Sequence, residues 1–492
     1  MFGDTRLDNV LSRILLAMTI RLSVVIRKLG DNRTVEICFG RFINNSKVTP
    51  EKIVAGVSKQ NACACVGRHV LFINDTTAMS FGMNANRGNL GYVGMSKNIS
   101  GFYMHAAIAV DALTGGCLGL FGLDVWQRSP DEKPNYASNL SEQELKALKK
   151  AAKKARRHLV YQTAFEDKES YRWLNVVQKA VHNCPDAARY TAVGDRESDV
   201  YEVMSGFKQA GLDFVIRSSH DRILFQLNSQ SNQDTTENQQ VSKKLYEKLN
   251  ARPVMGFYEI DLPKTDHRSA HVAKVAVKYC PVTLKFPSAK LKGNFLPELP
   301  IYAVQITEYP DTVVNNEQPI HWILLTSHPV ESLEDALVII QWYRWRWIIE
   351  QTFRTLKSKG LAIEESQVET YEALINLATL ALIAATQVMQ LVQARDGKTQ
   401  QTIQSGFTPI EIQGLEQLNI QLEGNTQKQK NPHNKDTLAF AVWVIARLGG
   451  WSGYEKQRPP GPITIRDGII RFYNILQGFR LNPQNQYVNE LV

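Results

Sequence analysis

The sequence contains few cysteines for its length, and their spacing does not suggest a shared role. Six cysteines are scattered over 492 residues, and the only close pair is Cys63 and Cys65. The sequence shows neither a disulfide framework nor the paired spacing of a zinc site. This pattern excludes a small disulfide-stapled scaffold and favours a reducing compartment.

Long hydrophobic runs are also scarce. The apolar run at residues 14–18 lies between acidic and basic residues, so it does not predict a signal peptide. The longest uncharged stretch, residues 373–394, carries Asn376, Thr386 and Gln387. Polar side chains at this density favour a buried core helix over a membrane span. We therefore expect no membrane partner.

The chain does have an excess of basic residues and enough apolar residues for a core. Lys and Arg number 57 against 48 Asp and Glu, which gives a formal net charge of +9, and hydrophobic residues make up 43%. This balance favours a polyanionic partner, because Lys and Arg that neutralise phosphates release condensed counterions. Charge alone leaves a merely basic soluble protein equally open.

Hydrophobic periodicity predicts an α/β fold with strands early in the chain. Strands are expected at residues 70–74, 103–113, 117–126, 189–193 and 214–218, with a Lys- and Arg-rich helix at 141–158 and another helix at 198–209. The order of three strands, helix, strand, helix, strand fits a ribonuclease-H-like sheet. The predicted fold class is therefore α/β, a ribonuclease-H-like catalytic domain.

Three regions follow from the same patterns. Residues 1–61 are expected to form a helical N-terminal domain, and residues 62–370 the ribonuclease-H-like domain. Alternating runs at about residues 221–320 indicate a β-subdomain inserted into that catalytic domain. Residues 371–492 are expected to be helical, with a polar connector up to Lys435 followed by two dimerisation helices. The predicted architecture is thus flanked by helical N- and C-terminal domains.

Three carboxylates are candidate metal ligands, and each has an ordinary structural alternative. Asp75 ends the first predicted strand, where an Asx turn is the alternative. Asp195 follows the fourth strand, where a helix cap is the alternative. Glu350 lies on a predicted helix, where it could instead pair with Arg346 or Arg354. Carboxylates that converge from separate elements can hold two divalent ions for phosphoryl transfer.

Residues 331–360 predict one long helix of about eight turns without proline. On such a helix Tyr343, Arg346, Glu350 and Lys357 fall within roughly 60° of arc. We therefore expect these four side chains to share one face.

These residues resemble the signatures of the DDE transposases of the insertion-sequence-four family, to which the transposase of transposon five belongs. The last catalytic helix of that family carries Tyr, Arg, Glu and Lys at the spacing found here from Tyr343 to Lys357. The motifs Asp75-Thr76-Thr77 and Asp195-Arg196-Glu197 match the family's two aspartate motifs. The resemblance implies that Asp75, Asp195 and Glu350 are catalytic and bind two Mg²⁺ ions, with Mn²⁺ as an alternative.

The resemblance also implies DNA-binding residues. Trp322 stands where the transposon-five type stacks a tryptophan on a base flipped out of the DNA end; a tryptophan in a strand core is the alternative. Tyr343, Arg346 and Lys357 would contact phosphates near that base. Further DNA contacts are implied for the two arginines Arg196 and Arg217.

The implied function is cut-and-paste transposition, in which hydrolysis, end hairpin formation and strand transfer follow one another. Its partners would be double-stranded DNA at the terminal repeats, target DNA and a second copy in a synaptic homodimer, in the bacterial cytoplasm near the nucleoid. Two features depart from the family: family members carry additional residues before Gly3, and Ser219 replaces an expected basic residue. A catalytically silent inhibitor of transposition and a metal-dependent DNA nuclease remain the alternatives.

Overall fold

Helices and strands of the computed structural model fall into two units, and each unit is described by itself. The first contains Met1–Glu132, Lys179–Arg189 and Trp347–Val492, and the second contains Lys133–Gln178 and Tyr190–Arg346. The predicted mixed α/β class is confirmed, while the domain boundaries at residues 61 and 370 stay predictions. The structure describes residues 2–82, 90–94, 99–128, 141–144, 146–148, 150–151, 162–225, 244–262, 269–287, 293–314, 317–357, 360–399, 401–453 and 459–480.

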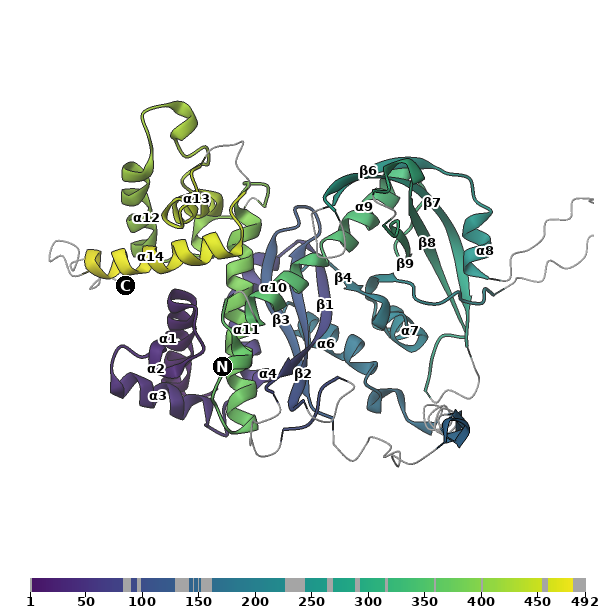
Figure 1. Ribbon diagram of the computed structural model, residues 1–492, viewed down its shortest axis with the longest axis horizontal. Coiled ribbons are helices and arrows are strands. Elements are labelled where there is room, and N and C mark those ends of the chain that lie inside the picture. The colour runs from purple at the N-terminus through teal and green to yellow at the C-terminus, as the bar shows by residue number, and fades with distance from the viewer. Residues whose placement is uncertain are drawn as a thin grey trace, which may run out of the picture. The chain divides into compact units, whose positions relative to one another are not determined.

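The first unit begins with the helices α1 (Thr5–Arg21), α2 (Ile26–Leu29), α3 (Arg33–Ile43) and α4 (Pro50–Asn61). Of these, α1, α3 and α4 start at a capping side chain. The side chains of Asp4, Asn32 and Thr49 each accept a hydrogen bond from a backbone N–H in the first turn of α1, α3 and α4. The apolar stripe predicted for the first helix is buried against α3 and α11, and Figure 1 shows α1, α2 and α3 grouped together.

An antiparallel meander follows in the same unit. It consists of β1 (His69–Ser80), β2 (Gly101–Asp111) and β3 (Cys117–Trp126). The predicted end of the first strand near Asn74 is wrong, because Asp75 and the residues up to Ser80 continue the strand and pair with β2. Every residue of β2 is buried, so this strand lies in the core. The turn before β3 uses Gly115 at φ 74°, a conformation that favours glycine.

The helix α11 (Tyr371–Ala394) forms the centre of the first unit. It contacts α1, α3, α4, β3 and also α10 (Trp347–Lys357). Among the described residues it alone is long and apolar enough to cross a membrane, and 83% of its most apolar window is buried inside the protein. The Asn376 side chain donates to the carbonyls of Ile43 and Val48 at 3.0 Å each. The prediction of a buried core helix is thereby confirmed.

Three further helices complete the first unit: α12 (Pro409–Leu422), α13 (Leu438–Leu448) and α14 (Pro462–Arg480). The last two confirm the pair of terminal helices expected from the sequence, and they contact each other and α11. Helix α12 lies in the stretch predicted to be a polar connector, for which the sequence patterns gave no separate helix. A capping box of Thr408 and Glu411 starts the helix. Its Gly414 lies against α14, where a Cβ atom would meet Leu476 at 2.9 Å.

The second unit is built on a mixed sheet with the order β4-β5-β9-β8-β7-β6. Its strands are β4 (Arg189–Gly194), β5 (Asp213–Arg217), β6 (Gly256–Leu262), β7 (His271–Lys285), β8 (Glu298–Glu308) and β9 (His321–Thr326). Strands β4 and β5 are parallel, and the other neighbours in this part of the sheet are antiparallel. The helices are α6 (Tyr171–His182), α7 (Tyr201–Gln209), α8 (Leu245–Asn250) and α9 (Leu333–Arg344). The strands predicted at 189–193 and 214–218 are confirmed.

Strands β6, β7 and β8 lie in the segment predicted to be an inserted β-subdomain. They continue the sheet beyond β9, and α9 contacts β5, β7 and β9. The polar piece at residues 226–243 and half of the predicted basic helix at 141–158 lie outside the described residues.

The long helix predicted over residues 331–360 is two helices, so that prediction is wrong. Helix α9 ends at Arg344, and α10 begins at Trp347. The Trp345 N–H still bonds to the Gln341 carbonyl four residues back, whereas the Arg346 N–H bonds to the Tyr343 carbonyl only three residues back. This tighter turn ends the α-helical ladder, so the four signature residues do not share one continuous helical face.

Candidate active site

Asp75 lies within β1, where its strand neighbours fix the direction of the side chain. It is half-buried and stands opposite the fully buried Ala106 of β2. Its Oδ1 atom accepts a hydrogen bond from the N–H of Thr76 at 2.8 Å. The Asx-turn alternative does not apply, because both residues are paired in the ladder with β2. A carboxylate thus emerges from the middle of a strand.

Glu350 lies in the first turn of α10, and α10 contacts β1. The amide groups at a helix N-terminus carry partial positive charge, which favours an ionised carboxylate there. The buried residues Ile349 and Phe353 hold the apolar side of this helix in the core of the first unit. Asp75 and Glu350, two of the three predicted ligands, are therefore carried by two contacting elements of one unit.

Lys357 lies in the last turn of the same helix, about two turns beyond Glu350. Burial lowers the pKa of its ammonium group, and the nearby carboxylate of Glu364 partly opposes that shift. Glu364 also accepts hydrogen bonds from the N–H and the hydroxyl of Ser80, at 2.8 and 2.9 Å. It therefore ties the end of β1 to the segment after α10. The sequence showed no signal for this role, because Glu364 is an acidic residue in a short connection.

Asp195 lies in the second unit, directly after β4. Its Oδ1 atom accepts from the N–H of Glu197 at 2.8 Å and caps a short 3₁₀ helix, so the predicted capping role is present. Gly194 is needed before it, because a Cβ atom there would lie 2.3 Å from the Ser198 hydroxyl. That hydroxyl donates to the Asp195 carbonyl at 2.6 Å. The cap holds the half-buried carboxylate at the end of the strand and does not exclude metal binding.

A cluster of cationic and aromatic side chains occupies the same unit. The rings of Trp322 and Tyr343 meet edge to face with centroids 5.3 Å apart. The guanidinium carbon of Arg217 lies 5.9 Å from the Trp322 ring centroid, and that of Arg346 lies 5.9 Å from the Tyr343 ring centroid. Arg217 also donates to the His321 carbonyl at 3.3 Å. We call Arg217, Trp322, Tyr343 and Arg346 the cationic aromatic cluster.

The pKa shifts in this cluster report its burial and its positive charge. Burial raises the pKa of the Tyr343 hydroxyl, and Arg346 and Arg217 partly oppose that effect. Asp195 acts on the same hydroxyl in the raising direction, so this carboxylate lies within electrostatic reach of the cluster. Tyr343 is only 4% exposed. Its hydroxyl therefore stays protonated at neutral pH and can donate a hydrogen bond.

His321 is a neighbour of the cluster that sequence reasoning did not single out. Burial lowers the pKa of its imidazole, and the positive charges of Arg217 and Arg196 lower it further. This places Arg196, which is exposed on the short helix after Asp195, within electrostatic reach of His321. The position of His321 directly before Trp322 was the available signal.

The predicted site residues thus fall into two groups. Asp75, Glu350 and Lys357 belong to the first unit, and Asp195 belongs to the second unit together with Arg196 and the cationic aromatic cluster. Within the described ranges, no group of three or more His, Cys, Asp or Glu side chains is close enough to hold a metal ion. The unit boundary separates Arg346 from Trp347 and so divides the signature from Tyr343 to Lys357.

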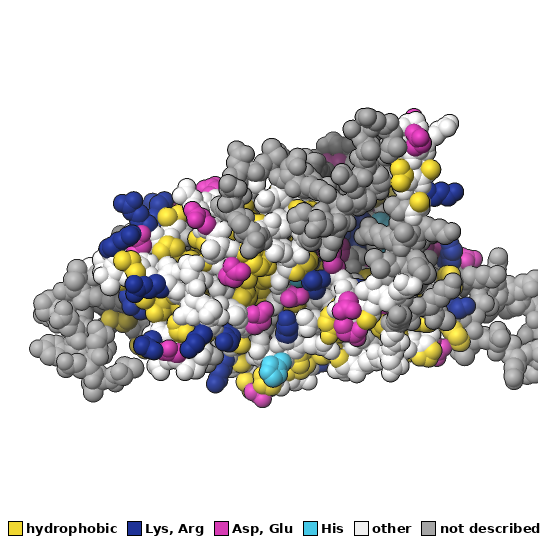
Figure 2. Space-filling model, turned by 90° about the horizontal axis from the view of Figure 1, so that it is seen from below, with side chains coloured by type: hydrophobic (Ala, Val, Ile, Leu, Met, Phe, Trp, Pro, Cys, Tyr) yellow, Lys and Arg dark blue, Asp and Glu magenta, His cyan; other side chains and the backbone are white. Residues whose placement is uncertain are grey.

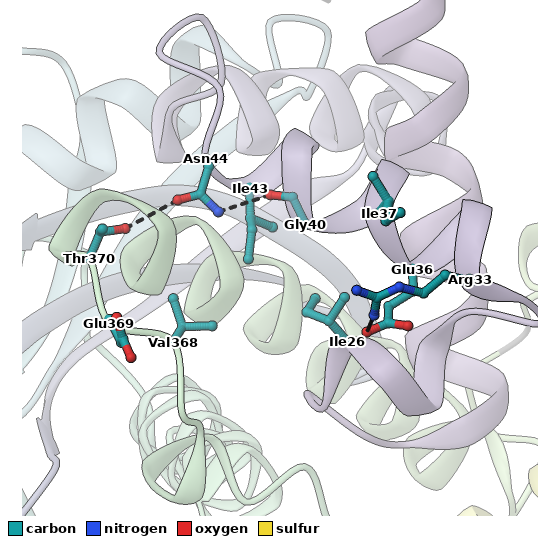
Figure 3. Close-up of a pocket in the computed structure, with 10 residues that line it drawn as sticks. All are labelled: Ile26, Arg33, Glu36, Ile37, Gly40, Ile43, Asn44, Val368, Glu369 and Thr370. Atoms are coloured by element: carbon teal, nitrogen blue, oxygen red, sulfur yellow. Dashed lines mark hydrogen bonds and ion pairs between the residues drawn. The ribbon is translucent and has the colours of Figure 1, made fainter.

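A surface hollow of about 440 Å³ in the first unit contains none of these residues. It lies between α2, α3 and the segment before α11, as Figure 3 shows. Arg33 in its wall is already paired with Glu36 at 2.6 Å, and Thr370 donates to Asn44 at 3.3 Å across it. These polar side chains thus pair with one another, and the hollow is a packing gap between helices.

The surface of the first helices carries many cations. Figure 2 shows Lys and Arg side chains close together on one face, mixed with hydrophobic ones. The exposed cations of α1, α2 and α3 are Arg6, Arg13, Arg27, Lys28, Arg33 and Arg41. Such a face suits a polyanion, and it matches the excess of basic residues in the sequence.

Comparison with known proteins identifies the class. Residues 174–387 match the family model described as the transposase DDE domain. The match covers β4 to β9, α9 and α10, with Asp195 and Glu350 inside it, and it begins after Asp75. The protein is accordingly an enzyme of the DDE transposase class, whose members act on DNA and depend on divalent metal ions.

One solved structure is also similar, though weakly. It is the cryo-EM structure of the piggyBac transposase synaptic complex with hairpin DNA, which is 7% identical with a TM-score of 0.34. The similarity covers 98% of this chain and 75% of that chain. A likeness of this size does not establish a shared fold.

The donor groups of the first unit fit a divalent metal ion. Hard cations such as Mg²⁺ and Mn²⁺ prefer carboxylate oxygens, and Asp75 and Glu350 supply such oxygens from contacting elements. Both side chains are half-buried, so each can reach a ligand at the surface while its backbone stays fixed. The residues present therefore suit the metal dependence of the class.

Proposed function

We propose that this protein is a cut-and-paste transposase of the transposon-five type, in which Asp75, Asp195 and Glu350 hold two divalent ions, Mg²⁺ in the cell. The observation that carries the proposal is the combination of a transposase DDE domain with strand and helix carboxylates at the signature positions. A bound divalent cation supplies Lewis-acid polarisation of the scissile phosphodiester.

Other side chains of the protein bind the DNA. Arg217, Arg346 and Lys357 bind phosphate oxygens, and the arginines can donate two hydrogen bonds at once. The Tyr343 hydroxyl donates a hydrogen bond to a phosphate oxygen, which agrees with the raised pKa of this hydroxyl. Trp322 offers a ring face to an unpaired base, with a stacking energy of about 1 to 3 kcal/mol. Tyr343 is not a nucleophile, because this chemistry needs no covalent protein–DNA intermediate.

The reaction then proceeds by exchange of phosphodiester bonds. Water attacks the phosphodiester at the transposon end and releases a 3′-hydroxyl. That hydroxyl attacks the opposite strand, which breaks one phosphodiester, forms another and closes a hairpin. A second water reopens the hairpin, and the freed 3′-hydroxyl joins target DNA by a further exchange. The half-buried positions of Lys357 and Arg346 suit phosphates that are held while these bonds exchange.

The wider organisation belongs to the same proposal. Residues 1–61 bind the terminal repeats through the exposed cations of α1, α2 and α3, residues 62–370 catalyse, and the terminal helices α13 and α14 pair two protomers in a synaptic complex. We place its action at the bacterial nucleoid. Arg196 contributes a further phosphate contact, which its exposed position permits.

The deciding experiment incubates the full chain with its own flanking transposon-end DNA and Mg²⁺ or Mn²⁺, and resolves the products on a denaturing gel. We expect metal-dependent nicks, hairpins and joined products that Glu350→Gln abolishes. The matched control is Glu365→Gln, because Glu365 is an exposed glutamate a few residues beyond α10. End binding without cleavage by the unsubstituted chain in either metal would identify a silent regulator. Nicks without strand joining would identify a DNA nuclease.

A further inference from the structure

A buried histidine lies on β2, the strand next to the one that carries Asp75. His105 of β2 is 0% exposed and stands opposite Thr76 in the β1–β2 ladder. Its Nδ1 atom lies 2.7 Å from the Thr76 hydroxyl oxygen, and its Nε2 atom lies 3.2 Å from the Asn74 amide oxygen. One imidazole therefore bonds to the two residues that flank Asp75.

The surrounding hydrogen bonds select one tautomer of this ring. The Asn74 amide group donates to the Phe72 carbonyl at 3.2 Å, which turns its oxygen towards His105. Nε2 must then carry the proton and donate to that oxygen, while Nδ1 accepts from the Thr76 hydroxyl. A neutral imidazole in this tautomer satisfies both partners in the core.

Strand geometry separates this network from the carboxylate itself. Successive side chains point to opposite faces of a sheet, so Asn74 and Thr76 lie on the His105 face and Asp75 lies on the other. Fixing both neighbours fixes the two peptide planes beside Asp75, and with them the direction of its Cα–Cβ bond. Asn74 is only 1% exposed, so a lost bond there cannot be replaced by bulk water at little cost.

We propose that His105 is a positioning residue that holds Asp75 in its metal-binding orientation through Asn74 and Thr76. This inference rests on the proposed function, because it takes Asp75 to be a metal ligand. Residues that orient metal ligands from behind typically change metal affinity by about 10- to 100-fold when they are replaced. His105 is fully buried and lies on the strand face opposite Asp75, so its effect should appear in metal binding before it appears in DNA binding.

The test compares His105→Leu with His105→Gln in the full chain bound to its own end DNA. Mn²⁺ binding is measured by electron paramagnetic resonance, end-DNA affinity by gel shift without metal, and stability by thermal unfolding. We expect His105→Leu to weaken Mn²⁺ binding by roughly 10- to 100-fold and to leave end-DNA affinity within about twofold. His105→Gln keeps a donor and an acceptor on its side chain, so it should recover most of the Mn²⁺ affinity.

His328 supplies a matched control in the second unit. It is also a buried histidine, and it bonds to the Thr191 hydroxyl of β4 at 2.8 Å. His328→Leu should lower thermal stability as much as His105→Leu does and leave Mn²⁺ affinity unchanged. Equal losses of Mn²⁺ affinity in the two variants, or native affinity in His105→Leu, would overturn the proposal.

Two further variants keep the outcomes distinct. If His105→Leu does not fold, Thr76→Val removes the hydroxyl at nearly constant shape, and it should weaken Mn²⁺ binding while Thr76→Ser does not. Asp75→Asn is measured in parallel. If Asp75→Asn itself retains Mn²⁺ binding and cleavage, the proposed function fails; if it loses both while His105→Leu keeps both, only the role of His105 fails.

Discussion

The two units of the protein carry different kinds of side chain at the predicted site positions. In the first, Asp75 and Glu350 come from a strand and a helix that each place one apolar side in the core. In the second, Asp195 follows a strand and lies within electrostatic reach of the cationic aromatic cluster. Of the predicted site residues, the first unit thus holds two carboxylates, and the second holds the arginines and aromatic rings of the cluster beside Asp195.

This difference explains why the signature from Tyr343 to Lys357 spans the boundary between the units. Tyr343 and Arg346 belong to the unit of the cationic aromatic cluster, whereas Glu350 and Lys357 belong to the unit of β1. Because the chain turns tightly at Arg346, α9 packs against β5, β7 and β9, whereas α10 packs against β1 and α11. A sequence motif that looks continuous therefore links two structural environments, one that contains strand and helix carboxylates and one that contains arginines and aromatic rings.

The largest effects should follow from replacing the carboxylates. We expect Asp75→Asn and Asp195→Asn each to reduce end cleavage by roughly 10²- to 10³-fold or more, measured as single-turnover rates on a gel. Asparagine caps helices as well as aspartate does, so Asp195→Asn should keep its stability and lose only its charge. The exposed Asp186 gives the control Asp186→Asn. Full cleavage by either variant would remove that residue from the metal site.

A smaller effect is expected from the ring of Trp322. Its replacement by alanine should weaken binding to an end with an unpaired terminal base by about 1 to 3 kcal/mol, whereas Trp322→Phe should keep much of that energy. Affinities for paired and unpaired ends are compared in a gel-shift titration. The control is Trp347→Ala, because Trp347 is 47% exposed and lies on α10. If Trp322→Ala lowers affinity equally for both ends, Trp322 only supports the strand.

The arginines should change the salt dependence of binding more than its sequence preference. Arg217→Ala is expected to reduce the slope of log K against log salt by about one, because one phosphate contact is lost. Fluorescence anisotropy at a series of salt concentrations measures this slope. Arg354 is exposed on α10 and provides the control Arg354→Ala. An unchanged slope in Arg217→Ala would show that Arg217 serves Trp322 and Tyr343 and not DNA.

The smallest effect concerns a single ion pair in the second unit. His271 lies 2.9 Å from Glu308, and this hydrogen bond raises the pKa of the imidazole. The stabilisation is therefore fully present below the unfolded pKa near 6.5 and is lost as pH rises through the raised folded value. We expect a change of about 0.5 to 1 kcal/mol, seen in hydrogen exchange of β7 amides and not of β2 amides. His271→Gln should flatten this pH profile, and a profile that keeps its slope would contradict the assignment.

Local patterns predicted most of the elements. The apolar stripe of the first helix, the strands near β2 to β5 and the buried helix at 373–394 all follow from periodicity, because burial on one face imposes a fixed spacing. The predictions failed at element ends and in polar stretches. Helix α12 was missed because few of its residues are buried and its composition resembles a loop. The end of β1 was missed because its continuation past Asp75 depends on pairing with β2.

The sequence by itself determined the class of the protein and its candidate residues. The spacing from Tyr343 to Lys357 and the motifs at Asp75 and Asp195 are local, so they can be seen without a structure. Tertiary structure decided how those residues are supported. His105 behind Asp75, Glu364 at the end of β1 and the turn that separates α9 from α10 all depend on contacts between distant segments. Such contacts leave no local spacing in the sequence, which is why only the folded chain reveals them.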